Sequence, residues 1–305
     1  MPSSIPYVDE VLSVTTGCSG DGCPCAGRSC WAEAMVKRFP KLHQKQGDLA
    51  YRWPINVPFS QVVCHPEALD KLAHWRKPRV VLVSALGDLF DKQVPAEFIR
   101  EVWSWMVSPA QSRHTYLVLT KQPQRMGDFH AVRCVLHGAV PGDNIWLGVS
   151  VWDQESADRM IPLLLDTPAA HRWVSYEPAL GPVKLTPYIG LRTHQCRCGF
   201  HETENELMLL GGDRWFCSDC GEQTTIRGAV NWVVAGCESG RGARPCETSW
   251  LLNVAAQCEQ AGVPCYLKQL RDATGKLIRR EPEAQELPWT LASKRPRNLT
   301  SAGAA

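Results

Sequence analysis

Short apolar segments alternate with longer amphipathic segments along most of the chain. The apolar segments are rich in β-branched and aromatic residues and predict strands, whereas the amphipathic segments repeat their apolar positions with helical periodicity. We expect strands at residues 12–16, 62–64, 79–84, 115–120, 145–151, 172–176, 231–235 and 265–268. We expect helices at residues 66–75, 95–107, 124–136, 154–165 and 249–261, several of which begin near a proline or an acidic residue.

This alternation predicts a βα repeat with parallel strands. The run Val80-Val81-Leu82-Val83 is apolar at successive positions, as in strands that are covered on both faces. The predicted strands fit an α/β fold of the TIM type, a (β/α) barrel that is complete or partly open, whose functional residues lie at the carboxyl ends of the strands. Here those ends carry Cys18, Ser84, Asp88, Thr120, Lys121, Ser150, Asp153, Gln154, Glu177, Glu238, Lys268 and Gln269.

The βα pattern stops at residue 191 and resumes after residue 227. We therefore expect a barrel made of residues 1–190 and 228–280 with an inserted module at residues 191–227. Residues 281–305 are rich in Pro, Glu and Ala and predict a loosely packed tail.

Composition and charge narrow the class of protein. Of the 305 residues, 44% are hydrophobic and 21% are charged, which is typical of a globular protein. The net charge of +2 neither indicates nor excludes nucleic acid as a partner. The sequence has no apolar segment long enough to span a bilayer and no signal-peptide pattern at its amino terminus. We therefore expect a cytoplasmic protein without membrane contact, in which clustered cysteines bind metal or take part in catalysis.

The first cysteine cluster follows the first predicted strand, in a glycine-rich loop that contains Cys18, Cys23, Cys25 and Cys30. Four thiolates can hold a structural zinc ion, but paired zinc ligands usually come from two separated turns. Three cysteines of one loop can instead hold a [4Fe–4S] cluster and leave one iron free for a substrate or cofactor. A loop of unligated thiols is the third alternative, and it would be exposed to oxidation.

Several further motifs accompany this loop. They are Trp75-Arg76-Lys77-Pro78-Arg79, Ala85-Leu86-Gly87-Asp88-Leu89-Phe90, Leu119-Thr120-Lys121-Gln122-Pro123, Trp146-Leu147-Gly148-Val149-Ser150-Val151, Ser175-Tyr176-Glu177-Pro178 and Gly236-Cys237-Glu238-Ser239-Gly240. Together with the loop they resemble a family of phage-encoded, radical-SAM-like barrel proteins, whose loop begins Thr-Gly-Cys and closes with Cys-Tyr-Ala-Glu. Trp31 stands here in place of the tyrosine.

The resemblance implies a [4Fe–4S] cluster that cleaves S-adenosylmethionine. The seven-residue step from Cys18 to Cys25 is that of the family, but Cys30 follows five positions after Cys25, where the family's third ligand follows three positions after its second. The implied ligands are Cys18, Cys25 and Cys30, with Cys23 as the substitute. Ser150, Glu177 and Glu238 are the candidate residues for cofactor binding, and Lys121 and Lys268 are the candidate catalytic residues. Each charged residue of this set has salt-bridge formation as its alternative role.

The second cysteine cluster lies in the predicted module, where Cys196 and Cys198 form one pair and Cys217 and Cys220 form another. This spacing is typical of a zinc ribbon held by structural Zn²⁺, with His194 and His201 as substitute ligands. Four arginines of the module, Arg192, Arg197, Arg214 and Arg227, accompany Trp215 and Phe216 in a mixture that suits phosphate contact and base stacking. A module whose aromatic residues cover only its own small core is the alternative.

Some members of the resembled family accompany phage thymidine hypermodification. The resemblance therefore implies a radical isomerase that converts an amino-acid-modified thymine such as glycyl-thymidine from an N-linked to a C-linked form, with DNA and an external electron donor as partners. A base in duplex DNA must be flipped out to reach such a site. The alternatives are a radical enzyme that acts on another nucleotide, a tRNA or a protein, and a non-catalytic nucleic-acid-binding protein with zinc in both clusters.

Overall fold

The computed structural model describes most of the chain on either side of the predicted module. The described residues are 5–28, 30–42, 44–45, 55–137, 142–190, 193–195, 201–203, 208–209, 215–216, 225–227, 229–239, 242–271, 275–278 and 287–288. None of the helices in these residues is long and apolar enough to cross a membrane.

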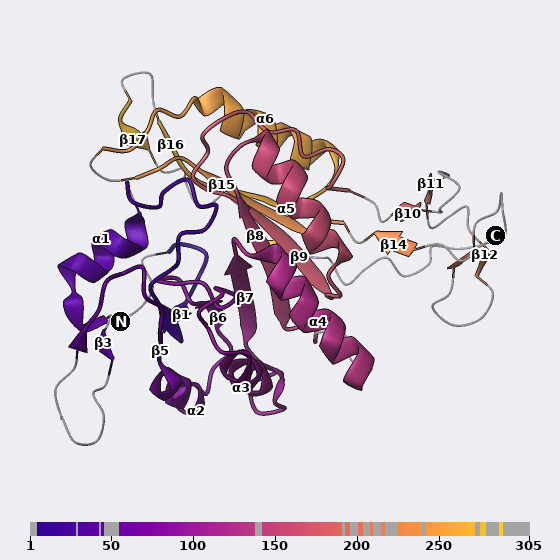
Figure 1. The fold of residues 1–305 in the computed structure, drawn as a ribbon. Coiled ribbons are helices and arrows are strands. Elements are labelled where there is room, and N and C mark those ends of the chain that lie inside the picture. The colour runs from indigo at the N-terminus through magenta and orange to yellow at the C-terminus, as the bar shows by residue number, and fades with distance from the viewer. Residues whose placement is uncertain are drawn as a thin grey trace.

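One mostly parallel sheet of eight strands organises the fold (Figure 1). Its order is β1 (Glu10–Leu12), β6 (Val80–Val83), β7 (Thr115–Thr120), β8 (Ile145–Val151), β9 (His171–Tyr176), β15 (Trp232–Gly236), β16 (Cys265–Arg271) and β17 (Leu277–Ile278). Neighbouring strands pair in parallel from β1 to β16, and β17 pairs with β16 in the antiparallel direction. The alternation of strands and helices predicted from the sequence is confirmed.

The predicted TIM-type barrel, complete or partly open, is wrong: the described strands form a mixed, mostly parallel sheet that ends in an antiparallel strand, and no pairing among them closes it. Strands β1 and β17 form its two edges, and no pairing joins them in the described part of the chain. The predicted strand at residues 12–16 is in fact divided: β1 ends at Leu12, and β2 (Thr15–Thr16) pairs outside the sheet with β5 (Val63–Cys64). The predicted strand at residues 62–64 therefore belongs to a small antiparallel ribbon and not to the large sheet. The large sheet thus lacks one of the parallel strands that a closed barrel would need.

The inserted zinc-ribbon module is not shown either. Cys196, Cys198, Cys217 and Cys220 lie outside the described residues, so their assignment to zinc remains a prediction from the sequence. Short antiparallel strands are described in this region: β10 (Thr193–Gln195) pairs with β11 (His201–Thr203) and β14 (Thr225–Arg227), and β12 (Met208–Leu209) pairs with β13 (Trp215–Phe216). A further hairpin near the amino terminus joins β3 (Gln44–Lys45) to β4 (Ile55–Asn56).

The helices follow the predicted pattern closely. They are α1 (Trp31–Arg38), α2 (Asp70–His74), α3 (Ala96–Val107), α4 (Pro123–His137), α5 (Gln154–Asp166) and α6 (Thr248–Gln260), with short 3-10 turns η1 (Pro40–Leu42) and η2 (Pro66–Leu69). The local sequence explains where some of them begin: α3 follows Pro95, and Asp153 caps α5 by accepting a hydrogen bond of 2.8 Å from the Ser156 amide. The predicted helix at residues 66–75 is divided into η2 and α2.

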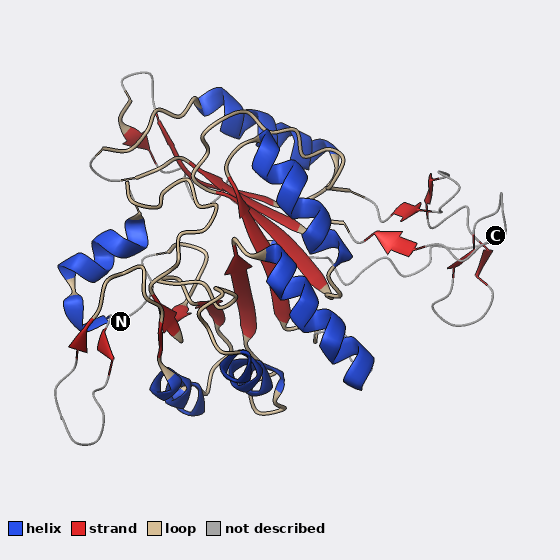
Figure 2. Cartoon of the chain, in the orientation of Figure 1, coloured by secondary structure: helices blue, strands red, loops and turns tan. Residues whose placement is uncertain are grey.

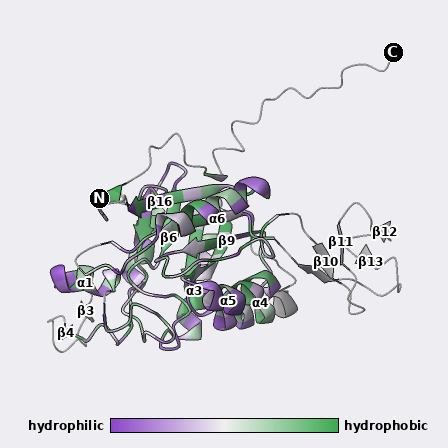
Figure 3. Ribbon diagram, turned by 90° about the horizontal axis from the view of Figure 1, so that it is seen from above, coloured by the Kyte–Doolittle hydropathy of each residue, from purple (hydrophilic) through white to green (hydrophobic). Residues whose placement is uncertain are grey.

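Both faces of the sheet are buried, which explains why its strands are apolar at successive positions. On one face, Val81, Val118, Leu147 and similar strand residues pack with residues of α3, α4, α5 and α6 in the main core. Figure 2 shows these helices beside the strands of the sheet. On the other face, the alternate positions form a second core with Tyr7 and Val8: Leu82, Leu117, Trp146, Trp173, Trp232, Val234 and Tyr266. In Figure 3 the central strands are largely hydrophobic, whereas the outer helices carry hydrophilic residues as well.

The predicted tail falls almost entirely outside the described residues. Of residues 281–305 only 287 and 288 are described, and Leu287 packs against the second core.

Candidate functional site

A pocket of about 370 Å³ lies at the carboxyl ends of the parallel strands. It brings together the whole first cysteine cluster and the five other residues predicted for the site. Its lining includes Cys18, Cys23, Cys25, Cys30, Ser84, Asp88, Lys121, Ser150, Glu177, Cys237, Glu238, Lys268 and Gln269. The open sheet therefore places the strand-end residues together, as the barrel prediction also required.

The cysteine loop is fixed to the loop that follows β6. The Gly17 amide donates to the Leu86 carbonyl at 3.0 Å, and the Ser19 amide donates to the Asp91 carboxylate at 2.7 Å. The approach is so close that a Cβ atom on Gly87 would lie 2.8 Å from the Thr15 hydroxyl and 3.0 Å from the Gly17 carbonyl oxygen. These contacts hold the first cysteine of the loop beside the ends of β6 and β7.

Cys30 occupies the N-cap of α1. Its sulfur accepts a hydrogen bond of 3.5 Å from the Glu33 amide, and the helix dipole favours a thiolate at this position. Burial raises the pKa of Cys30, and the backbone amides of Glu33 and Ala32 oppose that rise.

The other three thiols of the loop influence one another. Burial raises the pKa of Cys18 to about 12. The interaction between Cys23 and Cys25 lowers the pKa of Cys23 to about 5 and raises that of Cys25. The Cys25 thiol itself donates to the Glu238 carboxylate at 3.6 Å. Cys23 also acts electrostatically on Cys18 and Cys30, so it lies within range of the other three thiols. A metal centre held by thiolates would therefore release protons as it binds.

Arg244 connects the cysteine loop to the end of β15. It donates to both carboxylate oxygens of Glu238, at 2.7 and 3.0 Å, and to the Cys25 sulfur at 3.2 Å. It also donates to the Pro24 carbonyl at 3.0 Å. Glu238 is only 7% exposed, so this two-pronged ion pair compensates a carboxylate that burial would otherwise destabilise. Glu238, a predicted cofactor ligand, is thus already paired.

Glu177 and Lys268 form a second ion pair across the ends of β9 and β16, with 3.1 Å between Lys268 Nζ and Glu177 Oε1. Gly236 leaves room for this carboxylate, because a Cβ there would lie 2.6 Å from Glu177 Oε1. Glu177, Glu238 and Lys268 therefore all take part in salt bridges, which is the alternative role expected for the charged residues of this set. No salt bridge to the Lys121 ammonium is found among the described residues, although Lys121 lines the same pocket.

Asp88 ties the end of β6 to the end of β7. Its carboxylate accepts hydrogen bonds from the Thr120 hydroxyl at 2.8 Å, the Lys121 amide at 2.8 Å and the Phe90 amide at 2.9 Å. Burial raises the pKa of Asp88, and these hydrogen bonds counteract the rise. Asp88 therefore positions Lys121 through its backbone.

Two buried serines line the pocket, Ser84 after the end of β6 and Ser150 in β8. Ser84 has a φ of 60°, which is unusual for a residue other than glycine. Its buried hydroxyl has no hydrogen-bond partner among the described residues. Ser150, a predicted cofactor ligand at the end of β8, is 2% exposed.

The donor set of the pocket suits a group bound through thiolates. No three His, Cys, Asp or Glu side chains of the described residues stand in an arrangement that holds a single metal ion. In a [4Fe–4S] cluster each cysteine binds a different iron. Cys18, Cys23, Cys25 and Cys30 all line the pocket and are half-buried, so the thiols that such a cluster needs belong to one site.

Sequence reasoning missed Arg244 and Cys237. Arg244 is 219 positions away from Cys25, and a lone arginine in a loop has no local pattern that distinguishes it from a surface residue. Cys237 is a lone cysteine in the sequence, outside both cysteine clusters; it is 2% exposed and also lines the pocket.

Comparison with known proteins places the chain in a family. Residues 2–291 match a family described as "Protein of unknown function (DUF5131)", a description that names no activity. Neither the curated proteins nor the solved structures give a significant match to this chain. Because the family match covers most of the sequence, the chain belongs to the DUF5131 family of proteins of unknown function.

Proposed function

We propose that the protein is a radical S-adenosylmethionine enzyme. The observation that carries the proposal is the pocket in which the four thiols of one loop meet polar residues at the ends of six parallel strands, β6, β7, β8, β9, β15 and β16. The resemblance of the loop and the strand-end motifs to radical-SAM-like proteins supplies the reaction class. When bound, the cluster would supply the electron that cleaves S-adenosylmethionine to methionine and a 5′-deoxyadenosyl radical.

In this proposal Cys18, Cys25 and Cys30 hold the cluster and Cys23 is the substitute. The Arg244 guanidinium, which donates to the Cys25 sulfur, would then act as an outer-shell donor. Hydrogen bonds to ligand sulfurs tune reduction potentials in such centres. The Glu238 carboxylate holds this guanidinium in place.

The remaining polar residues would bind and orient the cofactor. Lys121 is the candidate partner for the carboxylate of S-adenosylmethionine, because no salt bridge to the Lys121 ammonium is found among the described residues. Ser150 offers a buried hydroxyl, and Glu177 offers a carboxylate that is held by Lys268. If Glu177 bound the amino or ribose groups of S-adenosylmethionine, its carboxylate would already be held in position by Lys268.

The substrate we propose is an amino-acid-modified thymine, such as glycyl-thymidine, in phage DNA. The protein would act in the host cytoplasm with an external electron donor, and it would rearrange the N-linked adduct to a C-linked one. Other nucleotides, tRNA or a protein side chain are the alternative substrates, and a non-catalytic nucleic-acid-binding protein is the alternative outside enzymes.

Anaerobic reconstitution of the full chain with iron and sulfide tests the proposal. We expect a brown protein with [4Fe–4S] absorbance that releases 5′-deoxyadenosine from S-adenosylmethionine when a chemical reductant is added. Cys18→Ala, Cys25→Ala and Cys30→Ala should each abolish both signals, and Cys23→Ala should reduce them much less. A colourless protein that binds zinc alone would rule out the radical chemistry.

Cys64→Ala is the matched control, because Cys64 is another half-buried free cysteine and does not line the pocket. It should keep both signals. If Cys23→Ala loses the cluster and Cys25→Ala retains it, the ligand assignment is wrong. The substrate is tested separately, by mass spectrometry of nucleosides from DNA made with and without the protein.

A further inference from the structure

Exposed apolar and cationic side chains gather on α1 and on the 3-10 turn η1 that follows it. Three of the eight large hydrophobic residues that are exposed in the described part of the chain lie here: Trp31 is 46% exposed, Phe39 47% and Leu42 40%. Val36 is the buried residue of α1, so the rest of the protein covers little of this helix. The α1 surface, as we call it, consists of Trp31, Arg38, Phe39, Lys41 and Leu42.

The positive charge of the α1 surface is not compensated by carboxylates. Glu33, the acidic residue in the first turn of α1, is paired with Lys37 at 2.9 Å. No salt bridge to Arg38 or Lys41 is found among the described residues. The Arg38 guanidinium lies 5.4 Å from the centroid of the Phe39 ring, so a cation and an aromatic ring are exposed side by side.

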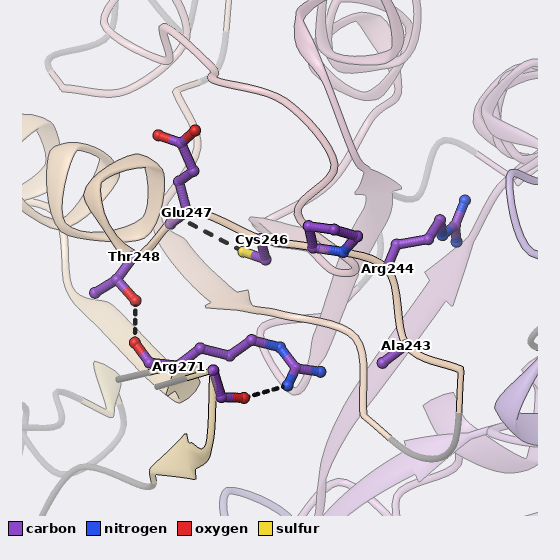
Figure 4. A pocket seen from close by; sticks show the side chains of 8 residues that line it. Ala243, Arg244, Cys246, Glu247, Thr248 and Arg271 are labelled. Carbon is purple, nitrogen blue, oxygen red and sulfur yellow. Dashed lines mark hydrogen bonds between the residues drawn. The ribbon is translucent and has the colours of Figure 1, made fainter. Parts of the chain in front are cut away.

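Other cationic side chains near the site are bonded to the protein itself. Arg244 and Arg271 line a neighbouring cavity (Figure 4). Arg244 donates to the Glu238 carboxylate at 2.7 Å, and Arg271 donates to the Gly275 carbonyl at 2.6 Å and to the Glu238 carbonyl at 3.0 Å. Arg38 and Lys41 differ from these two arginines, because an external anion can bind them without displacing a protein group.

The α1 surface is continuous with the site pocket. Trp31 lines the pocket and is also exposed, so it lies at the rim. Arg38 follows seven positions after Trp31, which is two helical turns, and the two side chains therefore share one face of α1. A ligand that lies along this face thus reaches the pocket.

We infer that the α1 surface binds unpaired nucleotides of a DNA strand, so that the neighbouring nucleotide can enter the pocket. Lysine and arginine side chains bind phosphates, and exposed aromatic rings stack on unpaired bases. Cations beside aromatic residues also suit an anionic membrane. However, the adjoining pocket is lined by the Glu177–Lys268 ion pair and by Ser150, which suit a base better than an acyl chain. The inference rests on the nucleic-acid substrate of the proposed function and not on its radical chemistry.

Fluorescence anisotropy with the full chain and a fluorescein-labelled oligothymidylate tests the inference. We expect the affinity to fall as salt rises, and we expect the single strand to bind more tightly than its duplex with oligoadenylate. Arg38→Gln/Lys41→Gln should weaken binding and reduce the slope of log affinity against log salt by about 1.4, the value for two lost phosphate contacts. Trp31→Ala should weaken binding about tenfold without changing this slope, because it removes a stacking contact.

Arg76→Gln/Lys77→Gln is the matched control, because it removes one exposed arginine and one exposed lysine. Both residues precede β6 and therefore lie at the opposite ends of the parallel strands from the pocket. This control should bind like the unchanged protein. All three variants should keep their thermal unfolding midpoints, since the substituted side chains are exposed. Equal losses of affinity in the control and the α1 variants, or tighter binding of the duplex, would overturn the inference.

The outcomes separate this inference from the proposed radical chemistry. If the protein cleaves S-adenosylmethionine but the α1 variants bind oligothymidylate normally, the inference alone fails. If the variants lose binding as expected but no reconstituted protein cleaves S-adenosylmethionine, the radical chemistry alone fails. Binding to phosphatidylglycerol vesicles or to polyglutamate, without binding to the oligonucleotide, would assign the α1 surface to another partner and overturn the inference.

Discussion

Lys121 and Lys268 line the same pocket, but their partners differ. Lys268 is bound to Glu177 at 3.1 Å, whereas no salt bridge to Lys121 is found among the described residues. A lysine that is already paired contributes to the stability of the fold, and a lysine without a carboxylate partner is available to a ligand. The two residues looked equivalent in the sequence, because each follows a strand and neither has a local motif that reveals its partner.

Substitution of each lysine by glutamine should separate these roles. Lys121→Gln should raise the dissociation constant for S-adenosylmethionine about tenfold, a loss of about 1.4 kcal/mol, with little change in the unfolding midpoint. Lys268→Gln should lower the free energy of unfolding by about 1–3 kcal/mol, because Glu177 then loses a charged hydrogen bond. Equilibrium binding and urea unfolding measure the two effects. A loss of stability from Lys121→Gln equal to that from Lys268→Gln would contradict the distinction.

Most of the elements could be predicted from the sequence, because strands buried on both faces and amphipathic helices leave clear local patterns. In contrast, local patterns could not predict that the sheet does not close into a barrel. Residues 12–16 are a continuous stretch with strand character, and the break after Leu12 arises from a tight turn in which the Val14 amide donates to the Leu12 carbonyl at 3.0 Å. The pairing of β2 with β5 depends on contacts between residues that lie far apart in the chain, which no local pattern encodes.

The second core depends on a glycine in β8. Gly148 lies opposite Trp173 of β9, and the buried Trp173 indole covers it. A Cβ atom on Gly148 would lie 2.4 Å from the indole nitrogen, which itself donates to the Trp146 carbonyl. The indole is fully buried and stacks on Trp232 with 5.2 Å between the ring centroids, so any shift of the indole would disturb this packing.

Gly148→Ala should therefore destabilise the protein by about 1–3 kcal/mol, the cost of overpacking a well-filled core. Gly127→Ala in α4 is the control: its nearest contact would be at 3.3 Å, and alanine gains helix propensity there. That control should be neutral or more stable by up to about 1 kcal/mol. Urea unfolding measures both, and equal stability of Gly148→Ala and the unchanged protein would show that the indole can relocate.

At the scale of the whole molecule, residues 191–227 interrupt a sheet that is continuous without them. Ile189 and Val230 form a parallel bridge, and the Val230 amide donates to the Tyr188 carbonyl at 3.0 Å. Directly beyond this bridge, the Asn231 amide donates to the Arg172 carbonyl at 2.8 Å and leads into β15. The two ends of the segment thus lie side by side, and the described residues that line the pocket all lie outside it.

Replacement of residues 191–227 by a short Gly/Ser linker should leave the sheet and the pocket intact, because the two ends already lie side by side and closing a short loop costs little. The thermal unfolding midpoint and cluster absorbance after reconstitution should stay close to those of the full chain. If Arg197, Arg214 and Trp215 contact DNA, which is one of the two roles that the sequence pattern of this segment allows, the deletion should also weaken DNA binding, and the loss should shrink as salt rises. A triple variant with Ala at these positions is the control for the deletion. Collapse of the sheet would assign the segment a structural role, and unchanged DNA affinity in both proteins would place the nucleic-acid contact elsewhere on the molecule.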